Sequence, residues 1–213
     1  MRSRLANLFY ENARQTPEKQ AIWCDGKTMT YKEMADLVSR YSNLLLSQGV
    51  AYGDHIAIPM NNSIESVALF FSAADLGVCV IPLNSSLPLE AIKVAMAAGD
   101  VKHIIARKSF FVDCERNGGL NIPGFAICLD QEHQGTVSFS MINEMSAERP
   151  EIDYDIDGNE SFILTMTSGS TGTPKPIDIS QNNKYDRAMA HVHVYKITKD
   201  DRIIAATPLY HSL

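Results

Sequence analysis

A run of nine residues late in the chain has the composition of a phosphate-binding loop. It consists of Thr167, Ser168, Gly169, Ser170, Thr171, Gly172, Thr173, Pro174 and Lys175. Glycine tolerates backbone conformations that bring amides close to a ligand, and successive N–H groups can then converge on an anion. Serine and threonine hydroxyls donate further hydrogen bonds to phosphate oxygens, and a lysine adds a charge-assisted contact. The run therefore predicts a polyphosphate site.

The run differs from two familiar nucleotide loops. A Walker loop needs Gly-Lys-Ser/Thr and a helix directly after it, whereas here Pro174 and Pro176 flank Lys175 and prevent a continuous helix. The dinucleotide spacing G-x-G-x-x-G does not occur in the run either. We expect strand, loop and strand, with apolar residues 162–166 delivering the loop to the sheet edge where ligands bind in open α/β folds. The alternative is a flexible Ser/Gly-rich linker, but such linkers are seldom bracketed by an apolar strand and a Pro-Lys-Pro sequence.

The segments before this loop alternate between strand-like and helix-like patterns. Strands are predicted at residues 21–24, 27–30, 55–60, 78–83 and 103–106. Helices are predicted from residue 5 to about 16, from 31 to about 48, at 63–76 and at 87–98. Near-continuous apolar strands separated by helices predict a layered α/β fold, with a mostly parallel sheet covered by helices on both faces. Thr30 with Glu33 forms a capping-box pattern, and Asp54 is interpreted as a turn residue.

The pattern weakens between residues 108 and 159, where we expect surface loops around one strand at 125–129. Further strands are predicted at 162–167, 177–180 and 202–206, with a helix from 181 to about 193. The sequence contains no linker long enough to separate domains, and 213 residues suit one large domain.

Composition narrows the class of protein. The net charge of −6 and the lack of any lysine or arginine run argue against a nucleic-acid groove. The start lacks a signal-peptide pattern, and the most apolar region, 67–82, contains Asp75 and is too short to span a bilayer, so we expect no transmembrane segment and a cytoplasmic protein. His191 and His193 lie two apart on a predicted helix and face different directions, and we expect no metal site. The cysteines, expected to be free thiols, are Cys24, Cys79, Cys114 and Cys128.

Residues 167–175 resemble the signature phosphate-binding loop of the adenylate-forming superfamily, which contains acyl-CoA synthetases, adenylation domains of nonribosomal peptide synthetases and luciferases. Further stretches resemble the family in the same order along essentially the whole chain. They are MTYKEM at 29–34, GV and GD with PMNNS between 49 and 63, LG with VIPLN between 76 and 84, and PLYHS at 208–212. Pro176 is a departure, because the family usually has glycine after the loop lysine.

The resemblance implies a reaction and its participants. A carboxylic acid attacks the α-phosphate of ATP, pyrophosphate leaves, and a thiol such as coenzyme A displaces AMP. Thr167 and residues 168–173 would bind ATP, with the loop donors on the β- and γ-phosphates and Mg²⁺ sharing their charge. Thr171 and Lys175 would act on the same phosphate oxygens during catalysis. His211 would line the acyl pocket beside the α-phosphate, although from the residues alone it reads as an ordinary loop histidine.

The resemblance also sets expectations for the domain. Members of the family continue well beyond this length, so residues 1–213 are expected to be the N-terminal part of the large AMP-binding domain, truncated and without the C-terminal lid domain. We expect these residues alone to form little or no acyl-AMP.

Three functional hypotheses stay open. They are an acid–thiol ligase acting on a small carboxylic acid, an adenylation domain that loads a carrier protein, and a non-catalytic nucleotide- or phosphate-binding module. A homo-oligomer is also left open.

Overall fold

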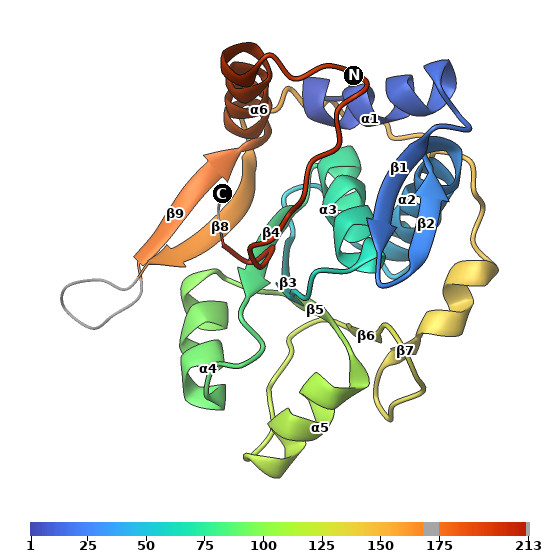
Figure 1. The fold of residues 1–213 in the computed structure, drawn as a ribbon. Helices are drawn as coiled ribbons and strands as arrows, with labels where there is room; N and C mark the ends of the chain where they lie inside the picture. Colours follow the sequence, from blue (N-terminus) through green and yellow to red (C-terminus); the bar gives the residue numbers. More distant parts are fainter. Residues whose placement is uncertain (168–174, 212–213) are drawn as a thin grey trace.

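A mostly parallel sheet forms the centre of the molecule (Figure 1). The computed structural model describes residues 1–167 and 175–211. Within them seven strands lie in the order β7-β6-β5-β3-β4-β8-β9, and every adjacent pair is parallel except β8 and β9. The strands are β3 (His55–Pro59), β4 (Cys79–Leu83), β5 (His103–Ala106), β6 (Ala126–Cys128), β7 (Val137–Ser138), β8 (Ser161–Thr167) and β9 (Lys175–Ser180). The predicted layered α/β fold is confirmed.

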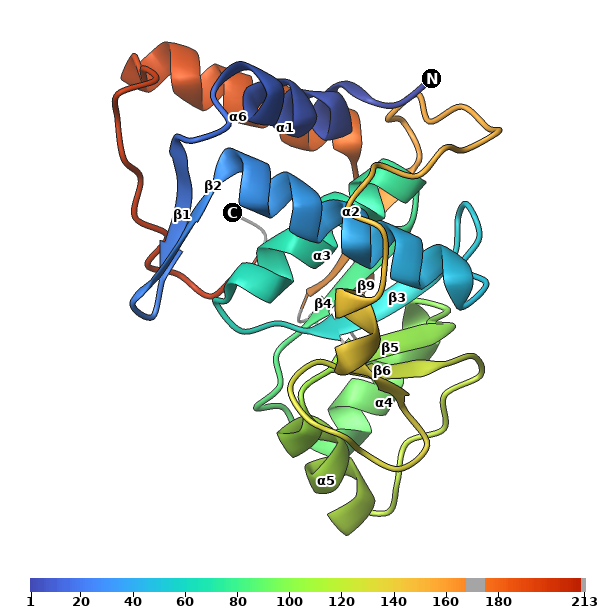
Figure 2. The ribbon, with the colours of Figure 1, turned by 90° about the vertical axis from the view of Figure 1, so that its right-hand side faces the viewer.

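Helices cover both faces of this sheet (Figure 2). One face carries α1 (Arg4–Gln15), α2 (Tyr31–Ser47) and α3 (Ile64–Leu76), and the other carries α4 (Leu89–Ala98) and α5 (Lys108–Arg116). The helix α6 (Gln181–Tyr195) follows β9 and contacts α1. The antiparallel hairpin of β1 (Gln20–Cys24) and β2 (Lys27–Thr30) packs beside α2.

Alternate residues of the central strands feed two separate cores. Val80 packs into the core under α2 and α3, whereas its neighbours Cys79 and Ile81 pack into the core under α4 and α5. All three side chains are fully buried. Full burial of one aliphatic side chain contributes about 1.5–3 kcal/mol. Because helices cover both faces of these strands, successive residues such as these are all apolar rather than alternating with polar ones.

Short-range hydrogen bonds and a glycine fix the ends of two helices and one turn. Thr30 Oγ1 accepts from the Glu33 N–H at 3.2 Å, and Glu33 Oε2 accepts from the Thr30 N–H at 2.7 Å, which completes the capping box. Asp54 Oδ2 accepts from the Ala51 N–H at 2.8 Å and closes the turn before β3. Gly77 ends α3 in the left-handed conformation at φ 64°, and a Cβ there would lie 2.6 Å from the Tyr52 ring.

Two predictions need correction. Residues 108–159 hold more structure than loops around one strand, since they include α5, a short β6, β7 and a 3₁₀ helix at Phe139–Asn143. Residues 202–206 were predicted as a strand, but they pair with no strand in the described part of the chain. Ile203 and Ile204 are 76% and 89% exposed there, because β-branched residues form a strand only where a neighbouring strand supplies the ladder.

All four cysteines are free thiols. Cys79, Cys114 and Cys128 are buried, and Cys24 is half-buried. Over residues 1–167 and 175–211, no helix has both the length and the apolar character that crossing a bilayer requires.

Candidate functional site

The candidate site lies where the parallel strands β3, β4 and β8 end. Because parallel strands point the same way, their carboxyl ends meet at one edge of the sheet. The chain leaves β3 towards α3 on one face and leaves β4 towards α4 on the other. Such a reversal between adjacent strands is the position where open α/β sheets bind ligands. The residues that follow these strands are therefore the candidates for chemistry.

Polar groups follow each of these strand ends. After β3, the Met60 N–H still donates to the Leu83 carbonyl at 3.1 Å, so the ladder extends to the rim before the chain turns. After β4, Asn84 Oδ1 accepts from the Ser86 N–H at 2.9 Å in a side-chain-closed turn. After β8 comes the predicted phosphate loop. Among the described residues, the ends of β3 and β4 thus present backbone amides and a short polar side chain.

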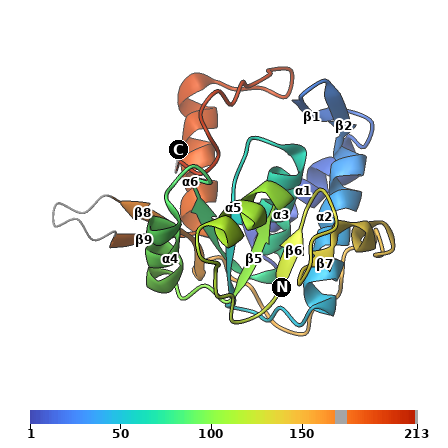
Figure 3. The same ribbon diagram turned by 90° about the horizontal axis from the view of Figure 1, so that it is seen from below.

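The antiparallel hairpin β8–β9 carries the predicted loop. Its register pairs Met166 with Pro176 and Thr167 with Lys175, so the two ends of the loop lie side by side. Pro176 is compatible with the ladder because β9 is the edge strand of the sheet. Figure 3 shows the outer part of the hairpin beside α4. The predicted order of strand, loop and strand is confirmed for both strands.

The predicted phosphate contacts fall mostly outside the described residues. Ser168, Gly169, Ser170, Thr171, Gly172 and Thr173 lie between residues 167 and 175, and the structure does not describe them. Thr167 ends β8 and Lys175 begins β9, which places the backbone of both at the rim. The roles of these residues stay predictions.

His211 lies in a turn near the same rim. Its N–H donates to the Pro208 carbonyl at 3.0 Å, and its ring centroid lies 4.5 Å from that of Tyr210. Tyr210 and Leu209 are half-buried against the core under α2 and α3. The His211 side chain is exposed, and its predicted place in an acyl pocket stays a prediction.

Asn62 is a residue of this rim that the sequence reasoning did not assign. Its side-chain Nδ2 donates to the Thr207 carbonyl at 3.1 Å, and its Oδ1 accepts from the Leu209 N–H at 2.9 Å. The only sequence signal was its position in the stretch PMNNS directly after a strand. Nothing in that pattern indicates a partner 145 residues later in the chain.

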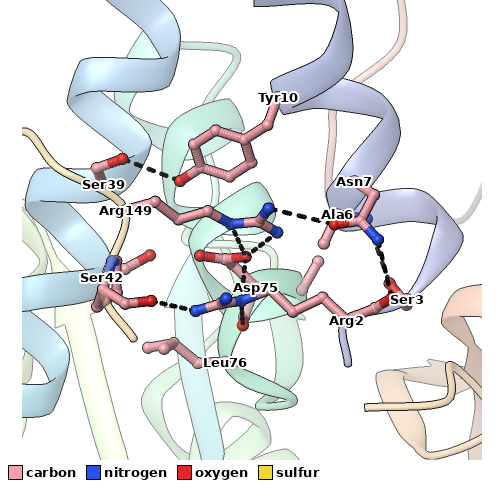
Figure 4. A network of polar contacts seen from close by, with 12 residues as sticks. Arg2, Ser3, Ala6, Asn7, Tyr10, Ser39, Ser42, Asp75, Leu76 and Arg149 are labelled. Atoms are coloured by element: carbon pink, nitrogen blue, oxygen red, sulfur yellow. Dashed lines mark hydrogen bonds and ion pairs between the residues drawn. The ribbon is translucent and has the colours of Figure 1, made fainter. Parts of the chain in front are cut away.

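A buried ion-pair network joins the elements behind the rim (Figure 4). Asp75 of α3 is fully buried, and its Oδ1 accepts from Arg149 Nε at 2.8 Å and lies 2.9 Å from Arg2 Nε. The Arg149 guanidinium also stacks over the Tyr10 ring at 4.0 Å, while the Tyr10 hydroxyl bonds Ser39 Oγ at 3.0 Å. Burial raises the pKa of Asp75, and the two guanidinium groups oppose that rise. The network ties the N-terminal segment to α3 and to the chain before β8.

A second titratable cluster lies at the opposite edge of the sheet. His103 is 3% exposed at the start of β5, with Nε2 3.4 Å from Asp54 Oδ2 and Nδ1 accepting from the Phe125 N–H at 3.2 Å. Lys102 Nζ lies 2.9 Å from Asp54 Oδ1. Burial lowers the pKa of His103, although hydrogen bonding to Asp54 opposes this effect. Burial opposes ionisation of Asp54, but the bonds from Ala51, Lys102 and His103 together hold its pKa below the usual value.

Comparison with known proteins identifies the family. The pattern of the family described as AMP-binding enzyme matches residues 9–213. The chain belongs to the AMP-binding enzymes. An indoleacetate–CoA ligase of Aromatoleum aromaticum is 28% identical over 209 residues, which cover 97% of this chain and 41% of that protein. A dimodular nonribosomal peptide synthase of Bacillus subtilis is 25% identical over 95% of this chain and 8% of its own length.

Solved structures of this family share the fold. The o-succinylbenzoate CoA synthetase MenE of Bacillus subtilis, in complex with the acyl-adenylate intermediate OSB-AMP, matches with a TM-score of 0.78 at 25% identity. That match covers 96% of this chain and 50% of the other. This AMP-binding chain therefore spans 41%, 8% and 50% of the lengths of these three proteins.

Proposed function

We propose that the gene product carrying this chain uses ATP to activate a small carboxylic acid as an acyl-AMP and then transfers the acyl group to coenzyme A. It would then be an AMP-forming acid–thiol ligase. The observation that carries the proposal is the family match over residues 9–213, supported by relatives that are CoA ligases. In this proposal, residues 1–213 form the N-terminal part of the large AMP-binding domain and act together with a further C-terminal lid domain.

The chemistry explains why such a loop belongs at this rim. Attack of a carboxylate on the α-phosphate brings two anions together and builds charge on the departing pyrophosphate. Amides and hydroxyls fixed in advance at the leaving oxygens lower that barrier without reorganisation during the reaction. The β8–β9 register supports this role, since it holds Thr167 and Lys175 side by side at the base of the loop.

Each predicted residue has a role in the proposal. Thr167 and residues 168–173 bind the phosphates of ATP, and Thr171 and Lys175 stabilise the charge that develops on the β- and γ-phosphates. His211 lines the acyl pocket beside the α-phosphate. Mg²⁺ binds together with ATP, as a counter-ion of its phosphates. Within residues 1–167 and 175–211, no group of three or more His, Cys, Asp or Glu side chains is placed to hold a metal ion.

Acid-dependent exchange of labelled pyrophosphate into ATP tests the reaction class. The assay uses the whole gene product and a panel of aliphatic, aromatic and dicarboxylic acids, and we expect exchange with at least one of them. The 213-residue chain assayed alone is expected to support little or no exchange. If no acid supports exchange by the whole gene product, the ligase proposal is wrong and a non-catalytic nucleotide-binding module becomes the better description.

A second candidate differs only in the acceptor. The match to a nonribosomal peptide synthase favours an adenylation domain that loads a carrier protein. Once an acid is found, coenzyme A and a phosphopantetheinylated carrier protein are offered separately as acceptors. Release of acyl-CoA supports the ligase, whereas acyl transfer to the carrier alone supports the adenylation domain.

A further inference from the structure

The side chain of Asn62 holds the segment that ends in His211. After α6 the chain returns to the rim (Figure 1). There the carboxamide of Asn62 makes two hydrogen bonds to the backbone of the returning segment. Nδ2 donates to the Thr207 carbonyl at 3.1 Å, and Oδ1 accepts from the Leu209 N–H at 2.9 Å. Both the donor and the acceptor of one planar amide are used by one backbone segment, so an ionised carboxylate, which cannot donate, would not reproduce the pair.

The two bonds follow the pattern of a parallel β-ladder. In such a ladder the N–H of one residue donates to the carbonyl before the residue opposite it, and the carbonyl of the same residue accepts from the N–H after that opposite residue. Asn62 bonds to the carbonyl of Thr207 and the N–H of Leu209, so its side chain takes the place of a neighbouring strand opposite Pro208. Pro208 lacks an N–H, but this pattern needs none from the central residue. The two bonds thereby hold the bend at Thr207 and the start of the turn at Leu209, in a segment that pairs with no strand in the described part of the chain.

Asn62 is itself fixed by its surroundings. It lies between the end of β3 and Ser63, which caps α3 by accepting from the Ser66 N–H at 3.1 Å. The carbonyl of Asn62 accepts from the Cys24 thiol of β1 at 3.4 Å. The clamp therefore rests on the central sheet, on the start of α3 and on the β1–β2 hairpin, all of which are set by the core.

The clamp constrains the position of His211. The Leu209 N–H is fixed by Asn62, and the His211 N–H donates to the Pro208 carbonyl at 3.0 Å, so the turn that carries His211 begins inside the clamped segment. Leu209 and Tyr210 pack against the core on the same segment. Loss of the carboxamide frees two backbone groups at the base of this turn, while the packing of Leu209 and Tyr210 remains.

We propose that Asn62 is a positioning residue that holds residues 207–211 at the carboxyl ends of β3 and β4 and thereby sets the place of the His211 imidazole at the carboxylic acid site. The functional half of this inference rests on the proposed function. Asn62 acts through the backbone of Thr207 and Leu209 and through the turn, and it need not touch the substrate.

Hydrogen exchange on the 213-residue chain tests the clamp itself. The variants are Asn62→Ala and the matched control Asn61→Ala, which removes the adjacent exposed asparagine. Loss of a hydrogen bond of ordinary strength is expected to raise exchange at the Leu209 amide roughly 5-fold in Asn62→Ala. Asn61→Ala should leave it unchanged. Equal protection of Leu209 in wild type and Asn62→Ala would overturn the clamp, provided that both variants keep the wild-type thermal midpoint.

Pyrophosphate exchange by the whole gene product tests the consequence. We expect Asn62→Ala to raise KM for the carboxylic acid about 10-fold, as for a loss of positioning, and to leave KM for ATP within about 2-fold. In a His211→Ala background, Asn62→Ala should raise KM for the acid little further, because the imidazole that Asn62 positions is already absent. Full additivity of the two changes, or equal effects on both KM values, would overturn the positioning role.

The two assays separate the failures. If no acid supports exchange, the proposed function fails and the role towards the acid fails with it, while the protection of Leu209 still decides the clamp. If exchange occurs and Asn62→Ala behaves as Asn61→Ala does, the proposed function stands and only this inference is wrong.

Discussion

Neutralising Asp75 tests whether the buried network holds the α-helical layer together. Asp75→Asn keeps the shape of the side chain and leaves Oδ1 able to accept hydrogen bonds, but it removes the charge that faces Arg2 and Arg149. Asp75 Oδ2 is buried and has no hydrogen-bond partner in the part of the chain that the structure describes, so the new amide N–H groups can take its place without breaking a bond of that oxygen. The change leaves two partly buried guanidinium groups without a counter-charge.

The expected loss follows from how buried the partners are. Removing one partner of a buried ion pair costs about 3–5 kcal/mol. The Arg2 and Arg149 side chains are 16% and 25% exposed and regain some hydration, so we expect the lower end, about 3 kcal/mol. For a chain of this size that lowers the thermal midpoint by about 6–12 °C. With a urea m value of about 2 kcal/mol/M, the urea midpoint falls by about 1.5 M.

Urea unfolding followed by circular dichroism measures this loss. The control is Asp36→Asn, which removes the exposed ion pair between Lys32 and Asp36 on α2. That change should move the midpoint far less, because exposed pairs gain little from their charges. A midpoint for Asp75→Asn no lower than that of Asp36→Asn, at an unchanged m value, would show that the network does not stabilise the fold.

Three further predictions concern the scaffold. Burial lowers the pKa of His103, so below about pH 6.5 the unfolded chain binds a proton at this residue that the folded chain binds less readily, and the free energy of unfolding decreases as the pH is lowered. His103→Gln should make the free energy of unfolding, measured by urea titration between pH 7.5 and 5.5, depend less on pH. An unchanged pH dependence would exclude His103 as its source. Gly77→Ala should cost about 2 kcal/mol in thermal unfolding, from the positive φ and the approach to the Tyr52 ring, and a neutral result would contradict that geometry. Thr30→Ala should cost about 1 kcal/mol by loss of the capping box, whereas Thr30→Ser should be tolerated; equal losses would point away from the hydroxyl.

Local signals made much of the fold predictable. The Thr30–Glu33 capping box starts α2 within four residues of sequence, and both of its bonds form as expected. The apolar strands β3, β4 and β5 follow from composition, because a strand buried on both faces needs no polar alternation. In each case the information lies within one element, so the sequence alone suffices.

The helix α5 escaped prediction because its start is satisfied from a distance. Arg107 at its N-cap makes no side-chain capping bond. The Lys108 N–H instead donates to Asp130 Oδ1 at 2.8 Å, which lies 22 residues further along. The Asn62 clamp escaped for the same reason, since its partners lie 145 and 147 residues away. Contacts of this kind exist only once the sheet has brought the segments together.

Substitution of the loop residues Lys175 and Thr171 in the whole gene product tests the central proposal most directly. The measurement is acid-dependent pyrophosphate exchange, with Lys27→Ala on the exposed β1–β2 hairpin as the control. If the loop stabilises the phosphates of ATP during the reaction, Lys175→Ala and Thr171→Ala each lower the exchange rate by about 10²–10³-fold and Lys27→Ala leaves it unchanged. Wild-type exchange rates in both loop variants would contradict the account.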